Sequence, residues 1–120
     1  MIRTQGLTHV QLVVRDLDRS LRFYTEVFGM TELFRDGPDL VFLRTPGSVD
    51  SITLNHQPDH TWTGSGGIQH IGFRLVDRAD LDEAIRQVEG AGGRLVERGE
   101  HQPGQPFAYV ADPDGYIIEF

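Results

Sequence analysis

The sequence has 120 residues, enough for one domain, with 38% hydrophobic and 24% charged residues as in an ordinary soluble protein. With 18 acidic and 11 basic residues the formal net charge is −7, which disfavours nucleic acid and anionic membranes as partners. There is no cysteine, which excludes disulfides and thiolate chemistry, and neither a signal peptide nor an apolar run of ~20 residues is seen, so we expect a cytoplasmic protein.

Two stretches of the chain follow one pattern. THVQLVVRDLDRSLRFYTEVFGM reads as a strand that begins with His9, an acidic turn and a helix, and QHIGFRLVDRADLDEAIRQVEGAGG repeats this order with His70 at the same place. Apolar residues alternate along both strands, and both helices carry apolar stripes. The stripes are Leu17, Leu21, Tyr24 and Phe28 in the first helix and Leu81, Ile85 and Val88 in the second.

Three short strands are expected after each helix. They lie around Thr31–Arg35, Asp39–Arg44 and Ser51–His56 in the first half, and around Arg94–Gly99, Phe107–Ala111 and Tyr116–Phe120 in the second. We therefore predict an α+β fold with two tandem β-α-β-β-β modules, residues 5–57 and 68–120, joined by a linker at 58–67. The two sheets are expected to form a cupped, partly closed barrel around a metal. Exposed strand edges favour pairing with a second chain, so we expect a homodimer.

His9, His70 and Glu119 supply the donors of a two-histidine, one-carboxylate metal site. A histidine in an apolar strand is more often a hydrogen-bonded core residue, and a carboxylate near a terminus is more often solvated. The equivalent positions of the two histidines favour the metal site. Counting from the prolines of RTPGSVDS and ADPDG puts Thr53 near the place in the first module that Glu119 holds in the second.

From about Leu7 to Phe120 the chain resembles the vicinal oxygen chelate superfamily, on the strength of HVQLVVRDLDRSLRFYTEVFGM, IQHIGF and YVADPDGYIIEF. That superfamily includes glyoxalase I, extradiol dioxygenases, fosfomycin-resistance transferases, methylmalonyl-CoA epimerase and bleomycin-binding proteins. The resemblance implies that His9, His70 and Glu119 bind a divalent metal, Fe(II) by preference, with Mn(II), Zn(II) or Ni(II) as alternatives. Glyoxalase I has a further carboxylate ligand where this chain has Thr53.

The second module is closest in motif to the extradiol dioxygenases. Gly99, His101, Tyr109, the turn Asp112–Gly115 and Glu119 follow their signature, and only Ala108 is smaller than the pattern expects. This resemblance implies catalytic roles for Tyr109 and His101. The acid-base histidine of those enzymes aligns with Asp50 or Ser51. Residues expected to contact the substrate are Gln11, Arg74, Phe107 and, as the nearest substitute for that histidine, His56.

The leading hypothesis is an Fe(II)- or Mn(II)-dependent extradiol-type dioxygenase that acts on a small catechol-like aromatic. One alternative is another metal-dependent lyase, isomerase or transferase of the glyoxalase type. Another is a protein that binds a small molecule or antibiotic and thereby confers resistance. The metal set with open coordination positions favours chemistry, and the missing acid-base histidine favours the alternatives.

Overall fold

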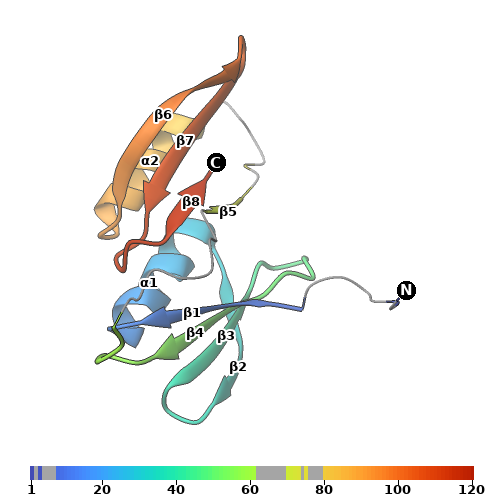
Figure 1. The fold of residues 1–120 in the computed structure, drawn as a ribbon, viewed down its shortest axis with the longest axis vertical. Helices are drawn as coiled ribbons and strands as arrows, with labels where there is room; N and C mark the ends of the chain where they lie inside the picture. The colour runs from blue at the N-terminus through green and yellow to red at the C-terminus, as the bar shows by residue number, and fades with distance from the viewer. Residues whose placement is uncertain (2, 4–7, 62–69, 74, 76–79) are drawn as a thin grey trace. The chain divides into compact units, whose positions relative to one another are not determined.

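The structure is a computed structural model that describes residues 1, 3, 8–61, 70–73, 75 and 80–120. The chain divides into two compact units, Met1–His60 and Thr61–Phe120, which we call unit 1 and unit 2 (Figure 1). The described residues of each unit form one four-stranded sheet and one helix. The predicted α+β fold with two β-α-β-β-β modules is therefore confirmed.

Unit 1 has its strands in the order β1-β4-β3-β2. β1 pairs with β4 in parallel, and the other two pairings are antiparallel. The elements are β1 (Val10–Val14), α1 (Leu17–Phe28), β2 (Thr31–Asp36), β3 (Leu40–Arg44) and β4 (Ile52–His56).

The core of unit 1 lies between the sheet and α1. Alternate apolar residues of β1, β3 and β4 are buried, as a period of two requires: Leu12, Val14, Val41, Leu43, Ile52 and Leu54. The helix buries Leu17, Ser20, Phe23 and Tyr24. The predicted apolar stripe did not include Phe23, which is buried, and it included Leu21 and Phe28, which are only half-buried. The Asp16 carboxylate caps α1 by accepting a hydrogen bond from Arg19 N at 2.9 Å, and Gly29 ends the helix with φ of 63°.

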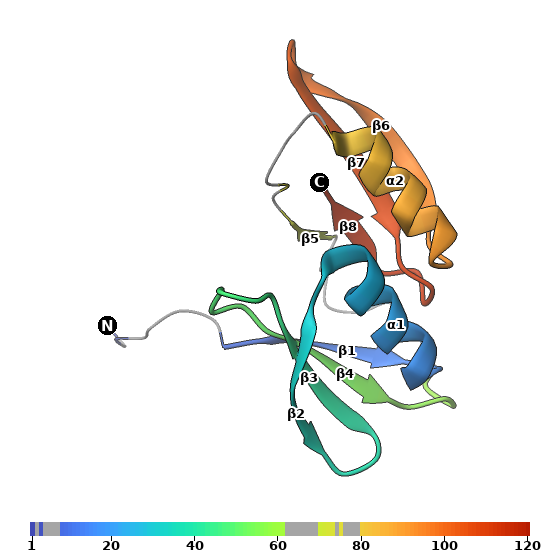
Figure 2. The same cartoon turned by 180° about the vertical axis from the view of Figure 1, so that it is seen from behind.

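Unit 2 repeats this topology, with its strands in the order β5-β8-β7-β6 (Figure 2). β5 and β8 are parallel, as β1 and β4 are. The elements are β5 (Ile71–Gly72), α2 (Leu81–Gly90), β6 (Arg94–Gln102), β7 (Gln105–Ala111) and β8 (Ile117–Glu119). The predicted helix stripe of Leu81, Ile85 and Val88 is buried, and Ala108, Val110 and Ile118 of the sheet are buried too.

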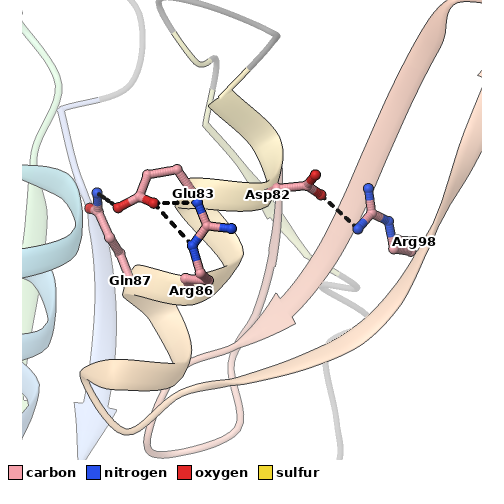
Figure 3. Close-up of polar contacts among 5 residues, drawn as sticks. All are labelled: Asp82, Glu83, Arg86, Gln87 and Arg98. Atoms are coloured by element: carbon pink, nitrogen blue, oxygen red, sulfur yellow. Dashed lines mark hydrogen bonds and ion pairs between the residues drawn. The ribbon is translucent and has the colours of Figure 1, made fainter.

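The exposed face of α2 is held by ion pairs (Figure 3). Arg86 and Gln87 donate hydrogen bonds to Glu83, and those bonds, from Gln87 first and then Arg86, hold the pKa of the Glu83 carboxyl below its usual value. Asp82 reaches across to Arg98 on β6 at 2.8 Å. These charged side chains therefore pair with one another on the surface of α2, and none of them belongs to the predicted site.

β6 is longer than predicted and changes the setting of His101. The strand continues to Gln102 because Pro103 and Gly104 form a tight turn into β7, with Gly104 at φ of 80°. His101 therefore lies in a strand and not in a loop.

Both sheets are open, so neither closes into a barrel by itself. The cup predicted between the two modules, and pairing with a second chain, stay predictions. No helix in the described part of the chain is both long enough and apolar enough to cross a membrane.

Candidate metal and substrate site

Glu119 of unit 2 is held between two imidazoles. In the parallel pairing of β5 and β8, Gly72 lies opposite Glu119, and the neighbouring Ile118 is buried in the core. Alternation therefore turns Glu119 to the sheet face away from α2. There Oε2 lies 2.9 Å from Nε2 of His70, and Oε1 lies 2.7 Å from Nε2 of His101. Both carboxylate oxygens thus face histidines predicted for the site.

Aromatic rings surround this group. The ring of Phe107 stacks on His101 with centroids 4.3 Å apart, and it meets the edge of Tyr109 at 5.3 Å. The Tyr109 ring lies 5.2 Å from His70, and its residue pairs with Glu119 across the strands. The predicted residues His70, His101, Phe107, Tyr109 and Glu119 are therefore neighbours.

Tyr109 lies between two acidic residues in neighbouring strands. It pairs with Glu97 of β6 on one side and with Glu119 of β8 on the other. Burial first, and then the charges of Glu119 and Glu97, raise the pKa of the Tyr109 hydroxyl above its usual value. At neutral pH the hydroxyl stays protonated and can donate a hydrogen bond. Glu97 was missed by sequence reasoning, because its place beside Tyr109 depends on the strand register.

A pocket of about 440 Å³ opens beside this group in unit 2. His101, Gln105 and Glu119 are its polar side chains. Its apolar walls are Phe73, Leu75, Leu81, Pro106, Phe107 and Phe120. This lining suits a small, largely apolar or planar group that presents oxygen atoms to Glu119 and His101.

The turn before β8 fixes the position of Glu119. Asp112 is 3% exposed, and its Oδ1 accepts hydrogen bonds from the backbone N of Asp114 and of Tyr116, both at 2.9 Å. Gly115 has φ of 96°, which only glycine adopts without strain. The ADPDG motif therefore sets where β8 begins.

His9 and Thr53 belong to unit 1. His9 is exposed, its Nδ1 lies 3.1 Å from Oγ1 of Thr8, and the edge of its ring meets Phe42 with centroids 5.9 Å apart. Its other ring nitrogen has no hydrogen bond within the described residues. Thr53 pairs with Gln11, two residues after His9, just as Glu119 pairs with Gly72, two residues after His70. Thr53 is thus the counterpart of Glu119, as the turn spacing predicts.

The remaining predicted residues lie in different settings. Gln11 is exposed on β1. His56, at the far end of β4, has both ring nitrogens 3.1 Å from an acceptor, namely Oδ1 of Asp39 and the carbonyl of Arg15, so it ties together parts of unit 1. A substrate role for His56 stays a prediction. Asp50 accepts a hydrogen bond from Thr45 N at 2.9 Å. Arg74 lies outside the described residues.

His70 and Glu119 suit a shared metal ion. Two ligand atoms that bind one divalent cation at about 2.1 Å each lie about 3 Å apart, and the His70 Nε2 to Glu119 Oε2 distance is 2.9 Å. Nδ1 of His70 is buried and has no hydrogen-bond partner in the described part of the chain. His70 and His101 contact different oxygens of Glu119, and within the described ranges no three His, Cys, Asp or Glu side chains are arranged as a metal would need. The third predicted ligand, His9, belongs to the other unit.

Comparison with protein families matches residues 6–120 to the Glyoxalase/Bleomycin resistance protein/Dioxygenase superfamily. Lactoylglutathione lyase of Neisseria meningitidis is 37% identical over 123 residues, which cover 95% of this chain and 88% of that protein. Lactoylglutathione lyase of Escherichia coli O157:H7 is 37% identical over 124 residues, which cover 94% of this chain and 89% of that protein.

Solved structures share the fold. The fosfomycin resistance protein FosX of Listeria monocytogenes, in an E126Q mutant complexed with Mn(II) and 1S,2S-dihydroxypropylphosphonic acid, superposes with a TM-score of 0.78 at 21% identity. The match covers 98% of this chain and 89% of FosX. Together with the family match over residues 6–120, these findings show that the chain belongs to the glyoxalase, bleomycin resistance protein and dioxygenase superfamily.

Proposed function

We propose that the chain is a metal-dependent enzyme of the glyoxalase type, a lyase or isomerase that acts on a small substrate with two adjacent oxygen atoms. One observation carries this proposal: Glu119 lies within 2.9 Å of His70, at the edge of a pocket of about 440 Å³. Relatives that match nearly the whole chain at 37% identity are named lactoylglutathione lyase. This naming favours glyoxalase-type chemistry over ring cleavage.

His9, His70 and Glu119 would hold the metal, which is a divalent ion such as the Mn(II) of FosX. When bound, such an ion polarises the oxygen atoms of the substrate. His70 and Glu119 fit this role by distance and by donor type. His9 has one ring nitrogen without a hydrogen bond within the described residues.

His101 is our candidate for moving a proton. Its Nε2 is hydrogen-bonded to Glu119 at 2.7 Å, the residue lines the pocket, and Phe107 fixes the ring by stacking. Imidazole can take and return a proton at neutral pH. The counterpart of Glu119 in unit 1 is Thr53, which cannot act as a base. A substrate different from that of glyoxalase I is therefore expected.

The second candidate is an extradiol-type dioxygenase. The specific observation in its favour is that His101 and Tyr109 both lie beside Glu119. A protonated Tyr109 hydroxyl, kept so by its raised pKa, could donate to an oxygen of a catechol ring. The apolar pocket walls would suit such a ring.

The test begins with elemental analysis of protein purified without chelator. Wild type, His70→Ala and the control His60→Ala are then loaded separately with Mn(II), Ni(II), Zn(II) and, without oxygen, Fe(II). Each form is assayed for thioester formation from methylglyoxal with glutathione, for turnover of other vicinal oxygen substrates, and for oxygen uptake with catechols. His60 is an exposed histidine outside the site, so it controls for the loss of an imidazole.

Metal bound by wild type and His60→Ala but lost in His70→Ala, with turnover in the absence of oxygen, would support the glyoxalase-type proposal. Metal with oxygen uptake and a ring-cleavage product would replace it by the dioxygenase. Absence of bound metal in every form would refute both candidates and leave a protein that binds a small molecule.

A further inference from the structure

Three polar side chains share one face of the unit 1 sheet. β3 and β4 run antiparallel with Leu43 opposite Ile52, so the next pair along the hairpin is Arg44 and Ser51. Leu43 and Ile52 are buried in the core under α1. Because side chains alternate along a strand, Arg44, Ser51 and Thr53 lie on the opposite face.

The same face carries His9. β1 and β4 are parallel, with Val10 paired to Ile52, and the backbone N of Val10 donates to the carbonyl of Ser51 at 3.1 Å. His9 is therefore beside Ser51 at the head of the sheet. The candidate metal ligand of unit 1 and the three polar side chains belong to one surface.

Each of the three side chains has a buried atom without a hydrogen-bond partner among the residues that the structure describes. These atoms are Nε of Arg44, Oγ of Ser51 and Oγ1 of Thr53, and the Thr53 residue is 0% exposed. A buried polar atom without a partner costs free energy, so native proteins contain few of them. The three atoms belong to side chains on one face, and each can donate a hydrogen bond to an acceptor.

Arg44 carries a positive charge that no described carboxylate compensates. Arg44 forms no ion pair with any residue that the structure describes. Two carboxylates close to it in the fold have other partners: Glu32 binds Arg35 through both oxygens at 2.9 Å, and Asp50 accepts from Thr45 N at 2.9 Å. An anionic acceptor would meet an uncompensated guanidinium together with two hydroxyls.

We propose that Arg44, Ser51 and Thr53 form a subsite for an anionic oxygen group, such as a carboxylate or another oxyanion, next to His9. The subsite defines the substrate of the proposed function as an acid, and in this respect it rests on that function. Binding of the anion itself requires only unit 1 residues and can be measured without turnover.

The test uses NMR on the full-length, metal-free protein, titrated with acetate and with inorganic phosphate at constant ionic strength set by chloride. We expect saturable shifts of the Arg44 Nε–H signal and of the backbone amides of Ser51 and Thr53. Arg44→Gln should weaken binding about tenfold, since it removes a charge-assisted hydrogen bond. The matched control Arg35→Gln, which removes an arginine of the same unit, should leave binding unchanged.

Thr53→Val separates ligand binding from a structural role. The substitution keeps the shape of the side chain and removes a hydroxyl that bonds to no described residue, so we expect weaker anion binding together with a higher melting temperature. A hydroxyl that only supports the fold would give a lower melting temperature and unchanged binding, which would overturn the proposal. Arg44→Lys, which keeps the charge, serves as a second variant if Arg44→Gln does not fold.

Absence of saturable shifts with both anions would overturn the subsite, as would equal losses in Arg44→Gln and Arg35→Gln. Anion binding that depends on Arg44 in a protein that takes up no metal would support the subsite and refute the proposed function. Metal-dependent turnover without anion binding would support the proposed function and refute the subsite.

Discussion

Replacing Glu119 by glutamine should change the tautomer of one histidine and leave the other as it is. The amide keeps the size of the carboxylate but turns one acceptor oxygen into an NH₂ donor. Glu119 now faces Nε2 of His70 at 2.9 Å and Nε2 of His101 at 2.7 Å. The new side chain can offer its oxygen to only one of them.

Burial decides which histidine must change. Nδ1 of His70 is buried and no described residue bonds to it, so a proton moved there would be an unpaired buried N–H. The His101 side chain is 52% exposed, and a proton on its Nδ1 can bond to water. We therefore expect the amide oxygen of the variant to face His70 and the NH₂ to face His101, with His101 as the Nδ1–H tautomer.

The cost of Glu119→Gln follows from the same contacts. A hydrogen bond to a charged group contributes about 1 kcal/mol more to the free energy of unfolding than a neutral one. The contact with half-exposed His101 contributes less than this, because solvent screens it. Part of the lost free energy is regained, because Glu119 is only 23% exposed and the variant no longer has to desolvate a charge on folding. We expect the free energy of unfolding to fall by about 1 kcal/mol.

The assay is ¹⁵N NMR of the imidazoles in metal-free protein at about pH 8.5, where free imidazole is neutral, combined with urea denaturation. Glu100→Gln is the matched control, because Glu100 is an exposed carboxylate next to His101 on β6. A tautomer change at His70, or the same spectrum in wild type and Glu119→Gln, would refute this account of the cluster. So would an equal effect of Glu100→Gln.

Three further predictions concern the frame around the site. Asp112→Ala should lower the free energy of unfolding by about 2 kcal/mol, because two backbone N–H groups lose their acceptor; urea denaturation measures this, and the exposed Asp59→Ala should be nearly neutral. Gly99→Ala should change the ring proton shifts of His101, because the new Cβ would lie 3.1 Å from Cε1 of Phe107, which stacks on His101; an unchanged His101 spectrum contradicts it. Tyr109 has a raised pKa in the folded state, so its contribution to stability is full below pH 10.0 and is lost as the pH rises through the folded pKa. The loss of stability above that pH, followed by urea denaturation, should be smaller in Tyr109→Phe, and equal losses would contradict the assignment.

The sequence alone predicts the parts of the fold that follow from periodicity. Alternation in β1 and the stripe of α2 were read correctly because buried apolar residues recur with the period of the element. The predicted stripe of α1 left out the buried Phe23. A helix with apolar residues on adjacent faces does not reveal from sequence which face packs on the sheet. β6 was too short by three residues in the prediction, since the role of the Pro103–Gly104 turn depends on pairing with β7.

The part of the candidate site that follows from the repeat of the two halves could be predicted from the sequence. Repetition of the two halves placed His70 near Glu119, and the structure joins them at 2.9 Å. The contact of His101 with Glu119 could not be read from spacing, because it requires the length and register of the β6–β7 hairpin. The unpaired atoms of Arg44, Ser51 and Thr53 were equally inaccessible, since the absence of a partner is a property of packing in three dimensions.

The resemblance to a dioxygenase signature has a structural explanation that limits what it says about the reaction. Gly99 leaves room for Phe107, Asp112 caps the turn, and Gly115 adopts a positive φ. These residues specify how β6, the turn and β8 are built, and any enzyme that needs a carboxylate at this place in the sheet would need them too.

Only His101, Tyr109 and Glu119 of that signature have side chains at the site itself, and a proton-moving histidine beside a carboxylate serves an isomerase as well as a dioxygenase. The motif therefore predicts the geometry of the second module. The choice of reaction depends on residues outside this signature. In unit 1, Thr53 stands in place of a carboxylate, and Arg44 forms no ion pair with any residue that the structure describes.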